Sequence, residues 1–389
     1  MSHPLDHALV VSDLKSKLNV EVDGRYSLTN GSAMNHGGYA TLFLSLDPRF
    51  QPKQIVLIYD HEDQQFARTL ETLFTSRGIS VLHWTVDLSH IEETSHELYQ
   101  HVRGYGKPLP LCVNGDHPLL NTLCMQVFSD FKCPILCCVG GELYRLGARP
   151  QRISLQPQIE VDELLGHLGA RVHSSWEGIW FEDHLRALSH YLIGVAQGST
   201  IPLEIVQKLA QQARGNELQS PQVKGSEIST PFFAEVLDRF EAAGCVELNQ
   251  GHLLFSSEKH RAFCGGGWLS LYAQDVLRQL GASFKLWSAQ QDVHIELPQP
   301  YQLDAIIPLV ALLNTELLFF FCVNSVDPHL EIKLTQAEIL QAKFSARIIF
   351  LSTDTLDDTS RERIFRQAIF LAEGERLKAL PSWLSKAFT

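Results

Sequence analysis

"QIVLIYDHEDQQFARTLETLFTSRGISVLHWTV", residues 54–86, decides the fold of the first part of the chain. Gln54–Tyr59 and Ile79–Val86 are apolar runs of strand length on either side of a more polar segment. The apolar residues of that segment recur with the helical period and predict a helix over Asp63–Arg77. A strand, a helix and a second strand in this order predict two parallel strands joined by a helical crossover.

The same alternation extends in both directions along the chain. The further strands expected are Ala8–Val11, Leu109–Val113 and Pro134–Val139, and the further helices are Ile91–Val102 and Leu119–Phe131. This pattern predicts a Rossmann-like, doubly wound parallel sheet with helices on both faces. Ligands of such sheets bind beyond the carboxyl ends of the strands. The candidate ligand-binding residues after the first and fourth strands are therefore Ser12, Asp13, Asn114, Gly115 and His117.

The loop after the fourth strand, "CVNGDHPLLN" (residues 112–121), allows two interpretations. Asn114–Gly115 can form a tight turn and Pro118 suits the first position of a helix, so backbone N–H groups there could bind an anion. The alternative is a plain strand-to-helix connection in which Asp116 caps the helix. No GxGxxG follows the first strand and no GxxxxGK[ST] occurs, which argues against a dinucleotide cofactor and against P-loop chemistry.

Length and composition indicate an ordinary globular protein of two or three domains. The chain has 389 residues, of which 45% are hydrophobic and 20% charged, with a formal net charge of −12. An acidic chain is poorly suited to coat nucleic acid, although the net charge does not exclude a local basic groove. Its eight cysteines contain no CxxC pair, so we expect reduced, mostly buried thiols and no metal site. The sequence shows no secretion signal and no apolar run long enough to span a bilayer, which predicts a cytoplasmic protein without membrane contact.

The middle of the chain predicts a helix-rich connector. Asn216–Thr230 is polar without a clear period and reads as a linker, whereas Phe232–Ala243 has a helical period and ends at Gly244. "CVELNQGHLLF" (residues 245–255) then predicts a hairpin, and helices followed by a hairpin resemble a winged helix. The helix is net acidic, which favours packing or dimerisation over binding to DNA.

The last third predicts a second α/β core. "CGGGWLSLYAQDVLRQLG" (residues 264–281) introduces a helix, and "LDAIIPLVALLNTELLFFFCVNS" (residues 303–325) predicts a hairpin of two apolar strands. The other elements expected are the strands Phe284–Trp287, Val293–Leu297 and Arg347–Leu351 and the helices Thr335–Lys343 and Arg361–Phe370. This order of elements resembles the α/β core of restriction-endonuclease-like enzymes.

These parts together resemble the effectors of type III CRISPR systems that join a CRISPR-associated Rossmann fold (CARF) to a PD-(D/E)XK nuclease domain. Three local motifs carry the resemblance: "NGDHPLLNTLCMQVF" (114–128), "GGWLSLYAQDVL" (266–277) and the hairpin 303–325. The resemblance implies a CARF-like domain over 1–150, a helical linker and winged-helix-like segment over 151–262, and a nuclease-like domain over 263–389. It also implies a homodimer that senses cyclic oligoadenylate and then cleaves DNA or RNA with a metal ion.

The catalytic residues that the resemblance implies are mostly missing. Asp304 matches the first acid of the nuclease motif, but Phe321 stands in place of the second acid and Val323 in place of the lysine. Ser270 replaces a glutamate of the first helix. One carboxylate is a poor Mg²⁺ site, so we expect no catalytic residue and interpret Asp304 as a remnant. The alternative is a relocated site that uses the later Glu331 and Lys333 with Mg²⁺ or Mn²⁺.

The sequence therefore predicts a non-catalytic homologue that acts as a dimeric scaffold or regulatory component of a defence complex, with protein partners and no cofactor. Cyclic oligoadenylate is not favoured as a ligand, because Asp116 adds negative charge beside His117, an ordinary, mostly neutral histidine. Two alternatives stay open. One is a cyclic-oligoadenylate-activated nuclease with the relocated site, and the other is a nucleotide-sensing regulator that binds DNA through the winged-helix-like segment.

Overall fold

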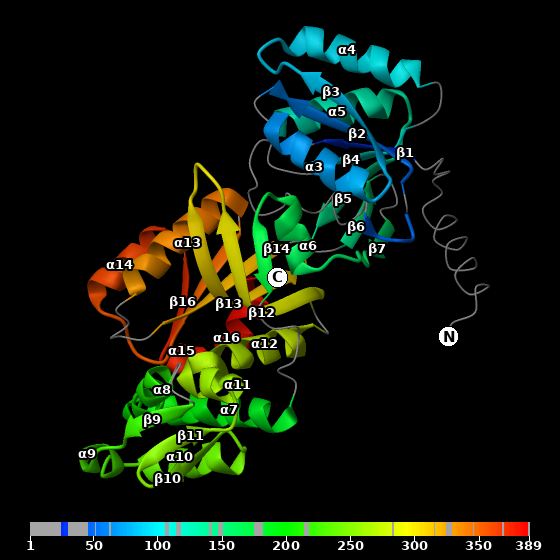
Figure 1. Cartoon of the computed structure of the whole chain (residues 1–389). Coiled ribbons are helices and arrows are strands. Elements are labelled where there is room, and N and C mark those ends of the chain that lie inside the picture. Colours follow the sequence, from blue (N-terminus) through cyan, green and yellow to red (C-terminus); the bar gives the residue numbers. More distant parts are fainter. Residues whose placement is uncertain are drawn as a thin grey trace, which may run out of the picture. The chain divides into compact units, whose positions relative to one another are not determined.

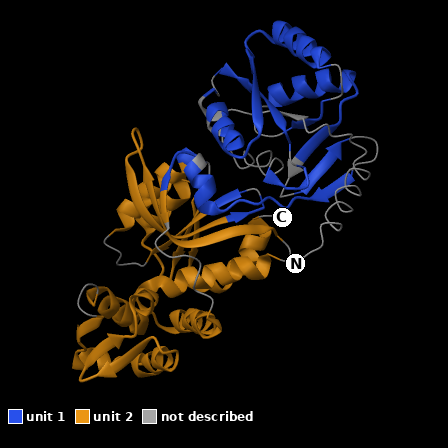
Figure 2. Ribbon diagram, turned by 45° about the vertical axis from the view of Figure 1, so that its right-hand side comes forward, with its two compact units in different colours: residues 1–171, 312–317, 342–346 blue, residues 172–311, 318–341, 347–389 orange. Residues whose placement is uncertain are grey.

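A computed structural model describes most of the chain as two compact units (Figures 1 and 2). The described residues are 25–29, 46–50, 52–61, 64–105, 109–113, 118–139, 142–146, 151–174, 182–213, 218–281, 284–314, 316–323, 329–344, 346–367 and 369–387. The first unit comprises residues 1–171 with 312–317 and 342–346, and the second comprises residues 172–311, 318–341 and 347–389. Among the described residues, none of the helices combines the length and the apolar character needed to cross a bilayer.

The first unit is built on a seven-stranded sheet with the order β3-β2-β1-β4-β5-β6-β7. Its strands are β1 (Arg25–Thr29), β2 (Gln54–Asp60), β3 (Ser80–Val86), β4 (Leu111–Val113), β5 (Ile135–Val139), β6 (Glu142–Leu146) and β7 (Gln151–Ser154). Its helices are α3 (Gln64–Ser76), α4 (Ile91–Gly104), α5 (Pro118–Asp130) and α6 (Val161–His167). The first five strands of this order, from β3 to β5, are parallel, as the strand–helix alternation predicts.

Two features of this sheet differ from the expectation. β6 and β7 extend it with antiparallel strands, so the sheet is not wholly parallel. Both are short and hold polar residues, so the sequence has no apolar run that would reveal them. The strand between β2 and β4 is Arg25–Thr29, whereas the strand expected at Ala8–Val11 lies outside the described residues.

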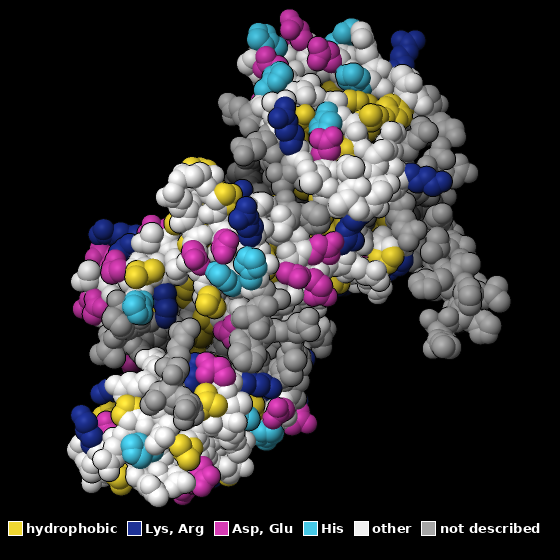
Figure 3. Space-filling view, viewed as in Figure 1, with side chains coloured by type: hydrophobic (Ala, Val, Ile, Leu, Met, Phe, Trp, Pro, Cys, Tyr) yellow, Lys and Arg dark blue, Asp and Glu magenta, His cyan; other side chains and the backbone are white. Residues whose placement is uncertain are grey.

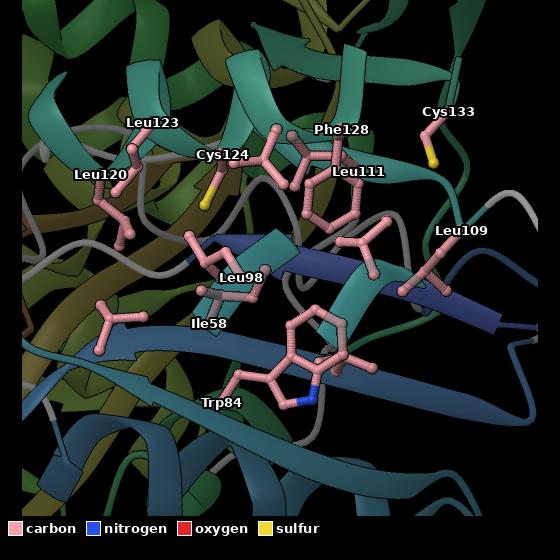
Figure 4. Packing of buried hydrophobic residues seen from close by; sticks show 14 of the residues in the cluster. Ile58, Trp84, Leu98, Leu109, Leu111, Leu120, Leu123, Cys124, Phe128 and Cys133 are labelled. Carbon is pink, nitrogen blue, oxygen red and sulfur yellow. The ribbon is translucent and has the colours of Figure 1, made fainter. Parts of the chain in front are cut away.

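The central strands β2 and β4 of this sheet are buried on both sides, whereas the outer strands β3, β6 and β7 are only partly buried. In β2, Val56 and Ile58 join a core cluster with α4 and α5, seen from close by in Figure 4. The intervening residues Ile55 and Leu57 are equally buried and point to the opposite face. In the core cluster, the indole of Trp84 also stacks on His101 of α4, with ring centroids 4.8 Å apart.

The second unit contains a winged-helix-like part. Its elements in chain order are α7 (Asp183–Gly198), α8 (Ile201–Gln212), β9 (Gln219–Gln222), α9 (Gly225–Ile228), α10 (Phe233–Ala242), β10 (Val246–Asn249) and β11 (His252–Phe255). β10 and β11 form the expected hairpin, and β9 pairs with β11 as a third strand.

The interpretation of Asn216–Thr230 as a linker is therefore wrong, since it contains β9 and α9. β9 is a polar edge strand that is held by backbone pairing to β11 and by the buried hydroxyl of Ser220, which accepts a hydrogen bond from Leu253 N. Neither contact leaves a periodic signal in the sequence.

Most of the remaining residues of the second unit surround a six-stranded sheet with the order β16-β15-β14-β13-β12-β8, of which residues 171, 312–313 and 316–317 are assigned to the first unit. Its strands are β8 (Arg171–Ser174), β12 (Leu286–Leu297), β13 (Leu303–Leu313), β14 (Glu316–Val323), β15 (Arg347–Ser352) and β16 (Phe370–Glu373). Its helices are α11 (Glu258–Ala262), α12 (Trp268–Leu280), α13 (Leu330–Phe344), α14 (Asp358–Arg366), α15 (Glu375–Lys378) and α16 (Leu380–Ala387), and a π-helical turn (Phe263–Gly267) precedes α12.

Two predictions about this sheet need correction, and one of its strands was not predicted. Phe284–Trp287 and Val293–Leu297 were expected as separate strands, but Leu286–Leu297 is a single strand with a positive φ of 50° at Asp292. The last predicted helix is shorter, and Phe370 begins the strand β16. β8 was not expected, because its four residues are mostly polar.

Candidate functional site

The hairpin β13–β14 contains the positions at which a PD-(D/E)XK nuclease would hold its metal ion. Asp304 is the second residue of β13, and its side chain is 78% exposed. Its carboxylate Oδ1 lies 2.7 Å from Nε2 of His294 on the neighbouring strand β12. The backbone oxygen of Asp304 accepts a hydrogen bond of 3.5 Å from Gln336 of α13. The one acid that matches the nuclease motif is thus paired with a histidine.

The positions of the second acid and the lysine are part of the core. Phe321 is 1% exposed and its ring stacks on Phe350 of β15, with centroids 5.1 Å apart and planes at 13°. Val323 is also buried. In α12, Ser270 is buried and its hydroxyl donates to the backbone oxygen of Gly267. Since Mg²⁺ takes oxygen ligands, this set of side chains offers the ion nothing beyond the Asp304 carboxylate.

Glu331 and Lys333 lie in the first turns of α13, not on a strand. An E-x-K pair on a strand puts both side chains on one face, but residues two apart on a helix point in different directions. The carboxylate of Glu331 is paired with Arg363 of α14 at the surface, whereas Nζ of Lys333 donates to the backbone oxygen of Cys322 at 2.8 Å. The helix therefore sends the two side chains of the E-x-K sequence to different partners.

Lys333 nevertheless reaches the end of β14, next to the position at which the nuclease motif has its lysine. Cys322 is partly buried there, and burial raises the pKa of its thiol to about 12. Of its charged neighbours, Lys333 lowers this pKa and Asp292 raises it. Asp292 of β12 is partly buried, and loss of hydration raises the pKa of its carboxyl from 3.8 to about 6. This carboxyl was not identified from the sequence, where nothing separates it from a surface Asp.

A group of histidine and acidic side chains lies on the exposed face of β8, β12 and β13. It comprises His173, His294, Glu296 and Asp304 and is called the His–carboxylate cluster below. Figure 3 shows histidine and acidic side chains gathered over β12 and β13. Sequence reasoning found only Asp304 of this group. The alternation in "VHIEL" (residues 293–297) signals that His294 and Glu296 share one face, but it does not reveal that β8 adds His173.

The strand order of the first unit identifies where a ligand of that sheet would bind. The order reverses direction between β1 and β4, and ligands of doubly wound sheets bind at the carboxyl ends of strands at such a point. Thr29 and Val113 are the last residues of these two strands and mark this position. Every predicted ligand-binding residue lies outside the described residues: Ser12, Asp13, Asn114, Gly115 and His117. α5 begins at Pro118, as predicted.

Two charged residues of α10 in the winged-helix-like part bind a side chain of the same unit. Tyr191 of α7 donates a hydrogen bond to Glu235 at 2.7 Å, and the guanidinium of Arg239 lies 5.0 Å from the centroid of the Tyr191 ring. These contacts direct the single arginine of α10 toward α7, which agrees with the expectation that this helix packs.

Comparison with known proteins gives fold similarity without sequence similarity. No protein-family model matches the chain, and the search of curated proteins finds no match. The crystal structure of protein VC1899 from Vibrio cholerae aligns with a TM-score of 0.74 at 17% identity, over 94% of this chain and 98% of that one. The structure of Can2 from Sulfobacillus thermosulfidooxidans in complex with cyclic tetra-adenylate aligns with a TM-score of 0.65 at 15% identity, over 96% and 99%. The mixed α/β fold of this chain thus resembles these two proteins over nearly their whole length.

Proposed function

We propose that this chain is a non-cleaving homologue of the CARF–nuclease effectors, acting as a dimeric scaffold or regulatory component of a prokaryotic defence system. The observation that carries the proposal is the stack of Phe321 on Phe350 inside the sheet, at the position where the nuclease motif needs its second acid. The similarity of fold to Can2 supports the relationship, and the buried apolar side chains support the loss of the usual site.

The apolar replacements disfavour cleavage at this site on energetic grounds. A carboxylate placed at Phe321 would have to be desolvated and would lie against an aromatic ring, which costs several kcal/mol unless a metal ion or cation compensates it. The lysine position is filled by the buried Val323. The relocated site is disfavoured as well, since Glu331 and Lys333 point to different partners from their helix.

A ligand-sensing role of the first unit would use the carboxyl ends of β1 and β4. Can2 forms a complex with cyclic tetra-adenylate, and a two-fold dimer of this chain would present the same loops twice to such a symmetric ligand. The negative charge of Asp116 would repel an anionic ligand. Cyclic oligoadenylate is therefore a ligand to be tested, but we do not propose it as the ligand. Isothermal titration with cyclic tetra- and hexa-adenylate, together with light scattering for the mass of the assembly, tests this part.

The decisive experiment is a cleavage assay of the purified chain. Duplex DNA, single-stranded DNA and RNA are incubated with Mg²⁺ or Mn²⁺, with and without cyclic oligoadenylate, beside the variants Asp304→Ala and Asp358→Ala. Asp358 is a fully exposed acid of α14 and serves as the matched control. We expect the wild type and both variants to give the same background. Cleavage by the wild type and Asp358→Ala that Asp304→Ala loses would overturn the proposal.

A further inference from the structure

We propose that the outer edge of β3 (Ser80–Val86) is a self-association surface, at which the same strand of a second copy of this chain pairs antiparallel and extends the seven-stranded sheet. Among the described strands, β3 pairs only with β2, and it lies at one end of the strand order (Figure 1). The inference goes beyond the proposed function, because it requires neither a ligand nor cleavage and concerns a strand edge, not the carboxyl ends of β1 and β4.

The sequence of β3 differs from that of the other strands at the edges of the described sheets. Proteins protect open edges with short strands, charged residues or proline, because an unpaired edge is a template for another chain. β8, which contributes His173 to the His–carboxylate cluster, is one of these protected edges. β7, β8, β9, β10 and β16 have four residues each and contain, in this order, Arg152, Arg171, Pro221, Glu247 and Glu373. β3 has seven residues, SVLHWTV, without Lys, Arg, Asp, Glu or Pro, so it lacks this protection.

Three residues of β3 direct their backbone groups toward the outer edge. The N–H and C=O groups of one strand residue point to the same side, and those of the next residue point to the opposite side. Ser80 N donates to the oxygen of Lys53 at 3.0 Å, so the groups of Ser80 and of every second residue after it point to β2. The groups that point outward belong to Val81, His83 and Thr85, and no described strand pairs with them.

These outward groups match a second copy of the same strand in one register. In an antiparallel pair with its two-fold axis at His83, Val81 lies opposite Thr85 of the second copy, and His83 lies opposite its own equivalent. Opposed residues of this kind exchange two backbone hydrogen bonds in each pair. With neutral imidazoles, no two like charges face each other, and the contact is isologous as in most homodimers. Any strand can satisfy the backbone groups, but this two-fold match favours a second copy.

The side chains of β3 leave apolar surface for a further strand to cover. Leu82 is 39% exposed and lies on the same face as Trp84, which belongs to the core cluster and is 7% exposed. In the proposed register, each Leu82 lies opposite Trp84 of the other copy, so pairing extends the apolar face across the axis. Pairing through one strand gives an interface at the small end of the range for stable complexes, about 1,200 Å² or less in total, and we expect dissociation constants of about micromolar order.

The test is the mass of the full-length protein in solution, measured by analytical ultracentrifugation from about 1 to 100 µM, the range that such an interface requires. The edge variants are Leu82→Lys and Thr85→Pro, and the matched control is Leu146→Lys. Leu146 ends β6 and is 40% exposed, against 39% for Leu82. Leu82→Lys brings two lysines within about 7–8 Å of each other across the axis. Thr85→Pro removes one outward N–H, which an edge strand tolerates without losing its pairing to β2.

We expect the wild type and Leu146→Lys to form the same assembly, and both edge variants to form one of half that mass at equal concentration. Wild-type protein that stays monomeric up to about 100 µM would overturn the proposal, since an interface of this kind should be occupied there. Edge variants with the same mass as the wild type would overturn it as well. Far-UV circular dichroism of each variant checks that the fold is kept.

Hydrogen exchange with residue resolution tests the pairing in the wild type, without any variant. At high concentration the outward amides of Val81, His83 and Thr85 should be protected, as are those of Leu82 and Trp84, which point to β2. Dilution to a concentration at which the assembly dissociates should speed exchange of the outward amides alone. Equal exchange of the outward amides at both concentrations would contradict the proposal. Cleavage of nucleic acid enters none of these measurements, so the proposed function is tested separately.

Discussion

β14 and the paired strands β12 and β13 belong to one sheet but differ in chemistry. β14 is buried almost throughout and its ring at Phe321 packs against β15. β12 and the first half of β13 alternate instead, with one buried face and one face that holds His294, Glu296 and Asp304. A nuclease of the PD-(D/E)XK kind would need its charges on β13 and β14 together. In this chain Asp304 of β13 instead has its partner His294 on β12, and Glu296 of β12 lies beside His173 of β8.

The position of a strand in the sheet thus decides what a polar residue on it can do. A strand covered on both faces can hold a charge only with a partner that compensates the lost hydration. An open face tolerates charges at little cost, and neighbouring strands can bring them together. We therefore expect charged substitutions to destabilise β14 far more than changes on the open face of β12 and β13.

The largest effect should come from restoring the acid in β14. We expect Phe321→Glu to lower the free energy of unfolding by about 3–5 kcal/mol, because it buries a carboxylate against Phe350 and removes a stacked ring. Urea denaturation followed by circular dichroism measures this. Phe321→Leu is the control, with an expected loss of about 1–2 kcal/mol. A loss below about 1 kcal/mol for Phe321→Glu would mean that β14 accepts charge.

The partly buried carboxylate of Asp292 in β12 should destabilise the fold at neutral pH. Because burial raises the pKa of Asp292 from 3.8 to about 6, the folded state binds more protons than the unfolded state between these values. Stability then falls as the pH rises through this window, by about 1.4 kcal/mol for each unit of pKa difference. We expect Asp292→Asn to stabilise the protein by about 1–3 kcal/mol at pH 7.5 and by nearly nothing at pH 3.5.

Asparagine suits this test because it tolerates the positive φ of 50° at this position. Urea denaturation at the two pH values gives the difference, with Asp358→Asn as an exposed control. A loss of stability at pH 7.5 would show that the charged form of Asp292 is held by its neighbours more strongly than burial opposes it.

Lys333 and Glu331 allow a smaller test within one helix turn. Lys333→Met should cost about 1–2 kcal/mol, because it removes a charged donor from the part-buried backbone oxygen of Cys322 but keeps the apolar stem. Glu331→Gln should cost at most about 0.5 kcal/mol, since its pair with Arg363 is at the surface. Equal losses in the two variants, measured by urea denaturation, would contradict the different roles given to them.

The sequence predicted most elements that have an apolar run or a clear period, and it missed those that depend on pairing. β2, β3 and β14 are apolar runs, and α3 has a helical period. β9 has the sequence Gln-Ser-Pro-Gln and becomes a strand only because β11 offers its backbone.

The candidate site shows the same limit. The absence of the acid and the lysine at Phe321 and Val323 could be read directly from the motif, as could Asp304. The partner of Asp304 could not, because His294 meets it only through the pairing of β12 with β13. His173 joins them through an edge strand that the sequence did not reveal.

The smallest effect should come from Asp304 itself. In metal-free buffer, Asp304→Asn should change the free energy of unfolding by less than about 0.5 kcal/mol, because an exposed pair with His294 contributes little and an amide oxygen can still accept its hydrogen bond. Thermal and urea unfolding, side by side with Phe321→Glu, give the contrast between the open face and β14. A loss of more than about 2 kcal/mol would instead make Asp304 a structural residue of this face.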